Sequence, residues 1–389
     1  MVWENATFRF INGVAVVTEH HSEVDLAFIA QQIDFLTPKR QQQLLQVTTS
    51  YQQLFNGDVD DCPEFESKEI KRVRKAYHAS RWNSILEPLH DQLRRSNATI
   101  IPITSEQYPA QLKQISSAPP LLFIKGDIDN LHLPQIAIVG SRKMTRGGER
   151  NAEDFSRFLA NSGFAITSGL AVGIDGAAHR GALQAHSGST IAVMATGIDA
   201  VYPRQHKYLA DQILDSGGTL VTEFVPNTKP LPHHFPQRNR VISGLSLGVL
   251  VVEAAMKSGS LITARTALEQ NREVFAIPGS IHNVQSRGCH WLIKQGASLV
   301  QEAEDIITEL AGALAGLNAS VSQVLSVRVE QDFDNEEQAL LDLMGFELVD
   351  LETLIERSHW SVTKLLQMLI SLELRNVVAN ENGCYQRLG

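Results

Sequence analysis

Six short apolar runs, separated by segments with helical spacing, occupy the middle of the chain between Gln135 and Ile277. The runs are Ile136–Val139, Phe164–Thr167, Thr190–Ala195, Thr219–Thr222, Leu245–Val252 and Val274–Ile277. The helical segments are Arg146–Ala160, Ile174–Ala185, Gln205–Asp215 and Thr263–Asn271. Regular alternation of buried strands and helices is typical of a parallel sheet with both faces covered. The sequence therefore predicts an α/β fold.

Glycine, hydroxyl and basic residues follow the C-terminal ends of five of these runs. In parallel sheets, ligands bind beyond the carboxyl ends of the strands, where the loops gather. Glycine permits close backbone approach, and arginine offers paired donors to phosphate oxygens. The loops are Gly140–Lys143, Ser168–His179, Thr196–Pro203, Phe235–Arg240 and the segment around Lys257. We therefore expect an anion-binding edge.

The stretch Val251–Ala264 combines an apolar run, a short polar turn and a helix-favouring segment that begins near Thr263. The first N–H groups of a helix carry partial positive charge and favour a bound anion. Lys257 adds a full charge beside them. A strand, a loop and a helix in this order predict a phosphate site.

Signatures of the common nucleotide-dependent enzymes are missing. The first strand lacks a Gly-x-Gly-x-x-Gly pattern, and no Gly-Lys-Ser/Thr loop occurs. Ser168, Asp175 and His179 invite a hydrolase interpretation, but Ser168 lacks the Gly-x-Ser-x-Gly context and the other two have helix-face spacing. Arg238 and Arg240 are stronger candidates for phosphate contact, with a structural salt bridge as the alternative. We expect no catalytic residue, metal site or cofactor.

Charge is distributed unevenly along the 389 residues. The formal net charge of −9 combines +5 over residues 136–300, −3 over 1–135 and −11 over 301–389. Phosphate binding needs Lys and Arg, so the basic middle fits a nucleic-acid partner better than the acidic ends do. Chance variation of surface charge is the alternative interpretation.

Neither a membrane-spanning apolar run nor a signal-peptide pattern is found, so we expect no membrane partner and a cytoplasmic location. The three cysteines are far apart in sequence, which argues against a disulfide framework and a zinc site. They are Cys62, Cys289 and Cys384.

Composition divides the chain into a helical domain (1–95), the sheet domain (96–310), a low-charge linker (311–333) and a last domain (334–389). The basic run from Lys71 to Lys75 either contacts a nucleic-acid backbone or, as we favour, forms a solvated helix face. The prolines and the Gly-Asp pair around 118–127 predict an irregular connector that ends in an edge strand.

The last domain is predicted to contain three helices and a hairpin, the arrangement of a winged helix. The helices span Asn335–Leu343, Asp350–Glu356 and Ser361–Leu374, and the hairpin turns at Asn382-Gly383. Lys364 is the one cation of the third helix, so we favour protein contact over DNA reading.

The loop motifs, taken together, resemble the motif series of the DNA processing protein A family, also called DprA or Smf. The resemblance covers about residues 100–300 and implies an extended Rossmann-like core, a SAM-like helical N-terminal domain and a winged-helix-like C-terminal domain. The matching segments are Val139–Arg142, Ser168–His179, Gly197–Pro203, Phe235–Ser246, Lys257–Ala264, Phe275–Ser280 and Ser286–Ile293.

This resemblance implies a non-enzymatic homodimer that binds single-stranded DNA, protects incoming DNA and loads the RecA recombinase during natural transformation. It assigns DNA contact to Arg142, Arg238, Arg240 and Lys257 with its loop. A cationic track is what a single strand requires, and Tyr202 and Phe235 are the candidates for base stacking. The expected DNA-contacting residues are Gly140, Ser141, Arg142, Lys143, Ser168, Gly169, Gly173, Tyr202, Arg238, Asn239, Arg240, Lys257, Ser258, Gly259, Ser260 and Thr263.

The alternative is an enzyme. The glycine-rich strand-loop-helix arrangement is also similar to that of nucleoside-monophosphate phosphoribohydrolases with a Rossmann-like fold. Those enzymes carry a Pro-Gly-Gly-x-Gly-Thr-x-x-Glu signature, whereas this chain has the sequence Lys257–Ala264 at that place. The single-stranded DNA binder is therefore the favoured interpretation.

Overall fold

The fold was obtained from a computed structural model of the chain. The structure describes residues 6–11, 14–19, 21–57, 64–79, 82–186, 188–314, 335–344, 349–358, 360–374, 378–381 and 384–387. The chain divides into two compact units, Met1–Leu325 and Ser326–Gly389. The boundary between them lies inside the segment 311–333, which the sequence predicts to be a linker.

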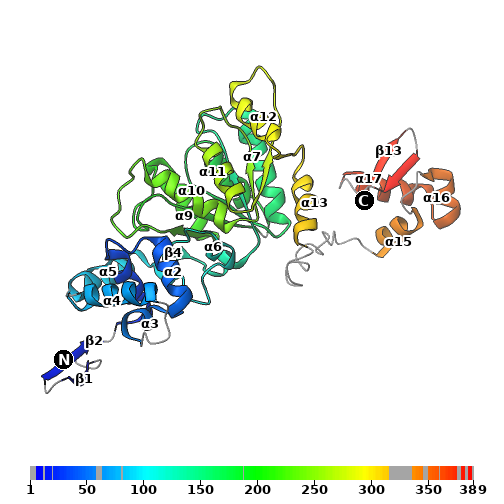
Figure 1. The fold of residues 1–389 in the computed structure, drawn as a ribbon. Coiled ribbons are helices and arrows are strands. Elements are labelled where there is room, and N and C mark those ends of the chain that lie inside the picture. Colours follow the sequence, from blue (N-terminus) through cyan, green and yellow to red (C-terminus); the bar gives the residue numbers. More distant parts are fainter. Residues whose placement is uncertain are drawn as a thin grey trace. The chain divides into compact units, whose positions relative to one another are not determined.

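A large, mostly parallel sheet forms the core of the first unit (Figure 1). Within the described residues it has nine strands in the order β11-β10-β9-β5-β6-β7-β8-β4-β3. The strands from β11 to β8 run parallel to their neighbours. They are β5 (Gln135–Val139), β6 (Ala165–Ser168), β7 (Ser189–Val193), β8 (Thr219–Thr222), β9 (Gly248–Val251), β10 (Glu273–Ala276) and β11 (Ser298–Leu299). All six predicted strands are present, and the α/β class is confirmed.

The strand order reverses between β5 and β9. Strands β6, β7 and β8 are added on one side of β5, while β9, β10 and β11 are added on the other. At such a point the connections leave neighbouring strands toward opposite faces, so a crevice opens beyond their carboxyl ends. The topology therefore brings the loops after β5 and β9 side by side.

Helices cover both faces of the sheet. One face carries α7 (Arg146–Asn161), α8 (Ile174–Leu183) and α13 (Ala303–Leu314). The other carries α9 (Lys207–Asp215), α10 (His234–Leu245), α11 (Ser260–Glu269) and α12 (Arg287–Lys294). Ile136 and Ile138 of β5 pack in the first core and Val139 in the second, because successive strand residues point to opposite faces. The short 3₁₀ turns are η1 (Asp129–His132), η2 (Arg204–His206) and η3 (Val284–Ser286).

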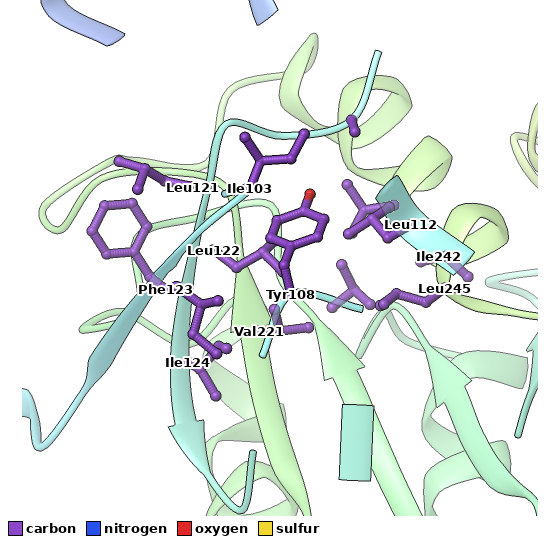
Figure 2. Close-up of a cluster of buried hydrophobic side chains, with 14 of the residues drawn as sticks. Ile103, Tyr108, Leu112, Leu121, Leu122, Phe123, Ile124, Val221, Ile242 and Leu245 are labelled. Carbon is purple, nitrogen blue, oxygen red and sulfur yellow. The ribbon is translucent and has the colours of Figure 1, made fainter. Parts of the chain in front are cut away.

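The expected edge strand is an interior strand. β4 (Leu121–Gly126) pairs antiparallel with β8 on one side and with β3 (Thr99–Pro102) on the other, so β3 forms the edge. Figure 2 shows β4 side chains in one apolar cluster with Val221 of β8, Leu112 of α6 (Ala110–Lys113) and α10. Pro119 and Pro120, which suggested an edge strand, precede β4 in the chain. At that position they do not need to donate a backbone N–H to a neighbouring strand.

The N-terminal part contains the helices that the sequence predicts and a hairpin that it does not. Ser22 forms a capping box with Asp25 at the start of α1, and Thr37 caps α2. The helices are α1 (Glu23–Gln32), α2 (Pro38–Thr48), α3 (Tyr51–Asn56), α4 (Glu64–His78) and α5 (Asn83–Ser96). The strands β1 (Ala6–Ile11) and β2 (Val14–Glu19) pair antiparallel.

This helical part and the sheet share one hydrophobic core. The Glu23 carboxylate accepts hydrogen bonds from the backbone N–H of Tyr51 (2.7 Å) and from the Thr104 hydroxyl (2.8 Å). In the basic run of α4, Arg74 donates to the Leu54 carbonyl (3.0 Å) and Arg72 lies over the Phe35 ring (3.9 Å). Lys71 and Lys75 are exposed, as on the solvated helix face that the sequence favours, whereas Arg72 and Arg74 make contacts within the helical part.

The second unit has the elements of the predicted winged helix. Its helices are α15 (Asn335–Met344), α16 (Leu351–Ser358) and α17 (Val362–Leu374), and its strands are β12 (Val349–Asp350), β13 (Val378–Glu381) and β14 (Cys384–Arg387). β14 pairs with both other strands. The Asn-Gly turn at 382–383 lies outside the described residues. No helix in the described part of either unit has the length and apolar character needed to cross a membrane.

Phe123 tests the interior position of β4, because its side chain is fully buried. Replacing it with alanine leaves a cavity, so Phe123→Ala should destabilise the first unit by about 3–5 kcal/mol. Thermal unfolding followed by circular dichroism measures the effect. Leu133→Ala, at a side chain that is 40% exposed, is the control and should change the melting temperature little. An unchanged melting temperature in Phe123→Ala would contradict the burial of Phe123 in the core.

Candidate nucleic-acid interface

A groove of about 770 Å³ lies at the carboxyl edge of the sheet, beyond β5 and β9. Loops that are more than 100 residues apart in sequence meet there, since Gly140 and Ser258 line the same space. The expected site residues that line it are Gly140, Ser141, Arg142, Lys143, Tyr202, Arg238, Asn239, Lys257, Ser258, Gly259, Ser260 and Thr263. Most of the predicted site is therefore brought together, and Ser168, Gly169, Gly173 and Arg240 are not part of the lining.

The buried Glu253 joins the end of β9 to the loop after β5. Its Oε2 accepts the backbone N–H of Thr145 (2.9 Å) and its Oε1 accepts the Thr145 hydroxyl (2.6 Å). The Glu253 carbonyl accepts the N–H of Ser141 (2.7 Å). The loop after β5 is therefore fixed against the end of β9, and a carboxylate of the protein itself occupies the N-terminus of α7.

Exposed cations border the groove. Arg142, Lys143 and Lys257 all line it and are solvent-exposed. The Arg142 guanidinium lies 5.4 Å from the Phe235 ring centroid, and the Tyr202 ring is 5.8 Å from that of Phe235. A phosphate chain and unstacked bases would find positive charge and aromatic faces within one continuous surface.

Helix α11 begins at Ser260, three residues before the predicted start near Thr263. Its first N–H groups are largely used within the turn: Leu261 donates to the Ser258 carbonyl (3.2 Å) and Ile262 to that of Gly259 (3.0 Å). The Ser258 and Ser260 hydroxyls lie 2.6 Å apart. Anion attraction at this loop therefore comes mainly from Lys257 and the hydroxyls, and less from free N–H groups than the sequence suggests.

Arg238 has a structural position that the sequence does not predict. Residues 235–240, expected as a loop, belong to helix α10, and the Arg238 side chain is only 4% exposed. Its Nη1 donates to the carbonyls of Gly169 and Val193, at the ends of β6 and β7. Burial lowers the pKa of the guanidinium to about 10, and the nearby Asp175 charge opposes that shift. Arg238 thus lies at the floor of the groove and holds strand ends together.

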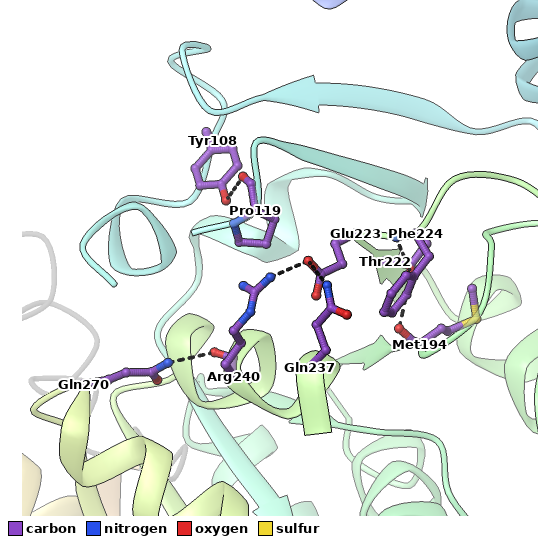
Figure 3. A network of polar contacts seen from close by, with 9 residues as sticks. All are labelled: Tyr108, Pro119, Met194, Thr222, Glu223, Phe224, Gln237, Arg240 and Gln270. Carbon is purple, nitrogen blue, oxygen red and sulfur yellow. Dashed lines mark hydrogen bonds and ion pairs between the residues drawn. The ribbon is translucent and has the colours of Figure 1, made fainter. Parts of the chain in front are cut away.

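Arg240 lies outside the groove because residues two apart on a helix are separated by about 200° around its axis. Its guanidinium forms an ion pair with Glu223, and both side chains are largely buried. Figure 3 shows this pair with Gln237, whose amide lies 3.4 Å from the same carboxylate, and with Gln270, which donates to the Arg240 carbonyl (3.1 Å). Arg240 therefore forms a structural salt bridge, the alternative to phosphate contact that the sequence allows.

Gly169 and Gly173, which were expected to contact DNA, pack against other residues of the protein. A Cβ on Gly169 would lie 2.2 Å from the Arg238 Nη1, and one on Gly173 would lie 2.2 Å from the Ser141 carbonyl oxygen. Gly173 also has a positive φ of +87°, which side chains rarely adopt. Both glycines therefore permit close packing beneath the groove rather than close approach of a ligand.

Ser168, Asp175 and His179 do not form a hydrolytic triad. The Ser168 hydroxyl donates to the Ile138 carbonyl (2.6 Å). The Thr190 hydroxyl donates to the Ile166 carbonyl (2.7 Å), so it accepts its 2.7 Å hydrogen bond from the Nδ1–H of His179. No group of three or more His, Cys, Asp or Glu side chains in the described ranges could hold a metal ion.

Sequence reasoning missed parts of the groove that carry neither charge nor glycine. Pro230, Pro232 and Pro236 form one wall, and Gln285 reaches it from the turn before α12. The density of proline after β8 is the signal that could have indicated a rigid wall. The local sequence gives no signal that Glu253 contacts the loop after β5, because Thr145 lies more than 100 residues earlier.

Arg238→Gln should destabilise the first unit. The shorter side chain leaves two buried carbonyls without their donor, at a cost of about 1–3 kcal/mol each. Thermal unfolding measures the loss, and Lys143→Gln, at an exposed position of the same groove, should leave the melting temperature unchanged. If Arg238→Gln kept the wild-type melting temperature, the structural role would be wrong.

His179 should make stability depend on pH. Burial lowers its pKa to about 3, below the value of about 6.5 for an unfolded chain. Between these values the unfolded state binds a proton that the folded state does not, so stability falls as pH decreases from about 6.5 toward 3. The contribution between pH 7 and pH 5 is about 2 kcal/mol.

Urea unfolding at pH 7 and pH 5 measures this dependence. His179→Asn keeps an N–H donor for Thr190 and should lose less stability than the wild type over that interval. His282→Asn, at an exposed side chain, should behave like the wild type. Equal losses in His179→Asn and the wild type would contradict a neutral, buried His179.

Comparison with known proteins agrees with this geometry. A family model described as DNA recombination-mediator protein A matches residues 99–311, and one described as the DprA winged helix domain matches residues 326–383. Protein Smf of Escherichia coli (strain K12) is 46% identical over 296 residues, which are 76% of this chain and 79% of that protein. DNA processing protein DprA of Streptococcus pneumoniae is 48% identical over 207 residues, or 53% and 72% of the two chains.

Two solved structures share the fold. DprA from Streptococcus pneumoniae superposes with a TM-score of 0.62 at 37% identity, covering 73% of this chain and 97% of that one. DNA processing protein A from Helicobacter pylori, described with a single-stranded DNA binding mode, has a TM-score of 0.50 at 27% identity, covering 56% and 96%. With a family model matching more than half of its length and a relative 46% identical, the chain belongs to the DNA processing protein A (DprA/Smf) family.

Proposed function

We propose that this protein binds single-stranded DNA in the groove at the carboxyl edge of its sheet. The observation that carries the proposal is the convergence of Arg142, Lys143 and Lys257, all exposed, on one surface with Tyr202. Single strands are held by a cationic track for phosphates and by aromatic rings for bases, with little sequence preference. The DNA binding described for the Helicobacter pylori relative supports the same assignment.

The arrangement favours binding over catalysis. The side chains that could serve as nucleophile and base, Ser168 and His179, are buried and engaged with Ile138 and Thr190. Asp175 is also buried, and burial raises its pKa while the Arg238 charge opposes that shift. These positions argue against a serine-hydrolase mechanism, and the phosphoribohydrolase signature is replaced by the sequence Lys257–Ala264.

The larger role that we propose follows from family membership. In it, a homodimer of this protein coats incoming single strands in the cytoplasm during natural transformation, protects them and delivers them to the RecA recombinase. Binding along the phosphate chain with weak sequence preference suits such a role, because incoming DNA has no fixed sequence. The acidic winged-helix domain is assigned to protein contact on the basis of its charge.

Lys257→Glu tests the DNA assignment. Removing the cation and adding a negative charge should weaken binding of a labelled oligo-dT by about tenfold or more and lower the slope of log K against log salt by at least about 0.7. Fluorescence anisotropy across a salt series measures both. Lys294→Glu makes the same charge change at an exposed site away from the groove and should have little effect.

The same titrations decide between the two classes of function. Absence of wild-type binding at low salt, or a flat salt response, would contradict the proposal. Release of adenine from AMP above the background rate would instead support the enzyme.

A further inference from the structure

A second cavity, of about 660 Å³, lies next to the groove. It is lined by α5 of the helical part, by β4, by the loop after β7 and by the segment η2–α9. Val201 lines this second cavity and Tyr202 lines the groove. The two spaces therefore share one loop, in which consecutive residues line different spaces.

Basic side chains from three parts of the fold converge on the second cavity: Arg95 from α5, Lys125 from β4, and Arg204 and Lys207 from η2 and α9. The lining also contains two carboxylates, and both are engaged. Asp199 accepts the backbone N–H of Asn227 (2.8 Å), and Asp211 pairs with Lys207 (3.1 Å).

Three of the four cations have no ion-pair partner in the described part of the chain. Within the described residues, Arg95, Lys125 and Arg204 form no ion pair and no side-chain hydrogen bond. Uncompensated positive charge in a concave surface attracts anions more strongly than the same charges do when they are dispersed. The lining of the second cavity therefore carries a formal net charge of +2, which favours an anion and is separate from the charge of the groove.

The chemistry of the cavity fits a chain of phosphates better than a free nucleotide. Its floor is aliphatic, formed by Ile198, Leu214 and Leu220, and no aromatic ring lines it. A nucleobase pocket usually offers stacking and a few converging polar groups. Tyr202, which is 46% exposed, lines the groove and directly follows Val201 of the cavity lining in sequence.

We propose that a DNA strand bound in the groove continues over Tyr202 into the second cavity, where its phosphates contact Arg95, Lys125 and Arg204. This inference rests on the single-stranded DNA binding proposed above. A base stacked on Tyr202 leaves the next phosphates beside Arg204, two residues along the chain. The helical N-terminal part is then a component of the DNA site, because α5 supplies Arg95.

The test compares two lengths of labelled oligo-dT on the full-length protein. An oligonucleotide of about four residues fills the groove alone, whereas one of about twenty can reach both spaces. The variant is the double substitution Arg95→Gln and Arg204→Gln. The control is Arg94→Gln, a neighbouring arginine of α5 that lines neither cavity. Anisotropy over a salt series gives affinity and salt slope for each.

The double variant should bind the longer oligonucleotide about tenfold or more weakly, with a salt slope smaller by about 1.4 for two lost phosphate contacts. Its affinity for the short oligonucleotide should equal that of the wild type, and Arg94→Gln should match the wild type at both lengths. Thermal unfolding checks the fold, and Arg95→Gln alone serves if the double variant is destabilised.

Wild-type affinity of the double variant for the longer oligonucleotide would overturn the inference, as would equal losses at both lengths. A third result would also overturn it: free dTMP lowers the affinity for the longer oligonucleotide to that for the short one, and leaves the affinity for the short one unchanged. That result would indicate a nucleotide site. In each of these cases groove binding still stands. Failure of the wild type to bind either length would overturn the proposed function itself.

Discussion

The Glu253 carboxylate is the contact on which the geometry of the groove depends. It lies at the point where the strand order reverses and accepts hydrogen bonds from the backbone and hydroxyl of Thr145. In sheets of this kind the helix that follows the first strand often binds a phosphate through its N-terminus. Here the Glu253 carboxylate occupies the N-terminus of α7, so a ligand would contact the side chains that line the groove instead.

The basic residues in and beside the groove differ in how deeply they are buried. Arg238 and Arg240 lie on different sides of α10 and are used inside the protein, one for strand-end carbonyls and the other for Glu223. Arg142 and Lys257 are exposed at the rim. A buried guanidinium with fixed partners shapes the floor, while an exposed cation is available to a polyanion.

The extension of the sheet by β4 and β3 has a consequence beyond stability. It joins the helical N-terminal part to the sheet through a continuous apolar core, and it places α5 beside the loop that carries Tyr202. One loop, which carries Val201 and Tyr202, thus contributes to both the groove and the second cavity. On the path that we propose for the DNA strand, the helical part follows the groove.

The sequence by itself determined the α/β class, the six parallel strands, the winged helix and the clustering of loops at one sheet edge, because these depend on local periodicity and on a general rule of parallel sheets. It also indicated Lys257 and Arg142 correctly as residues of the groove. Only the tertiary structure decided which cations face outward. Arg238, Arg240 and Glu253 have partners many residues away, and the helix that separates the two arginines was read from sequence as a loop. Burial and pairing arise from contacts between distant segments, which local patterns do not contain.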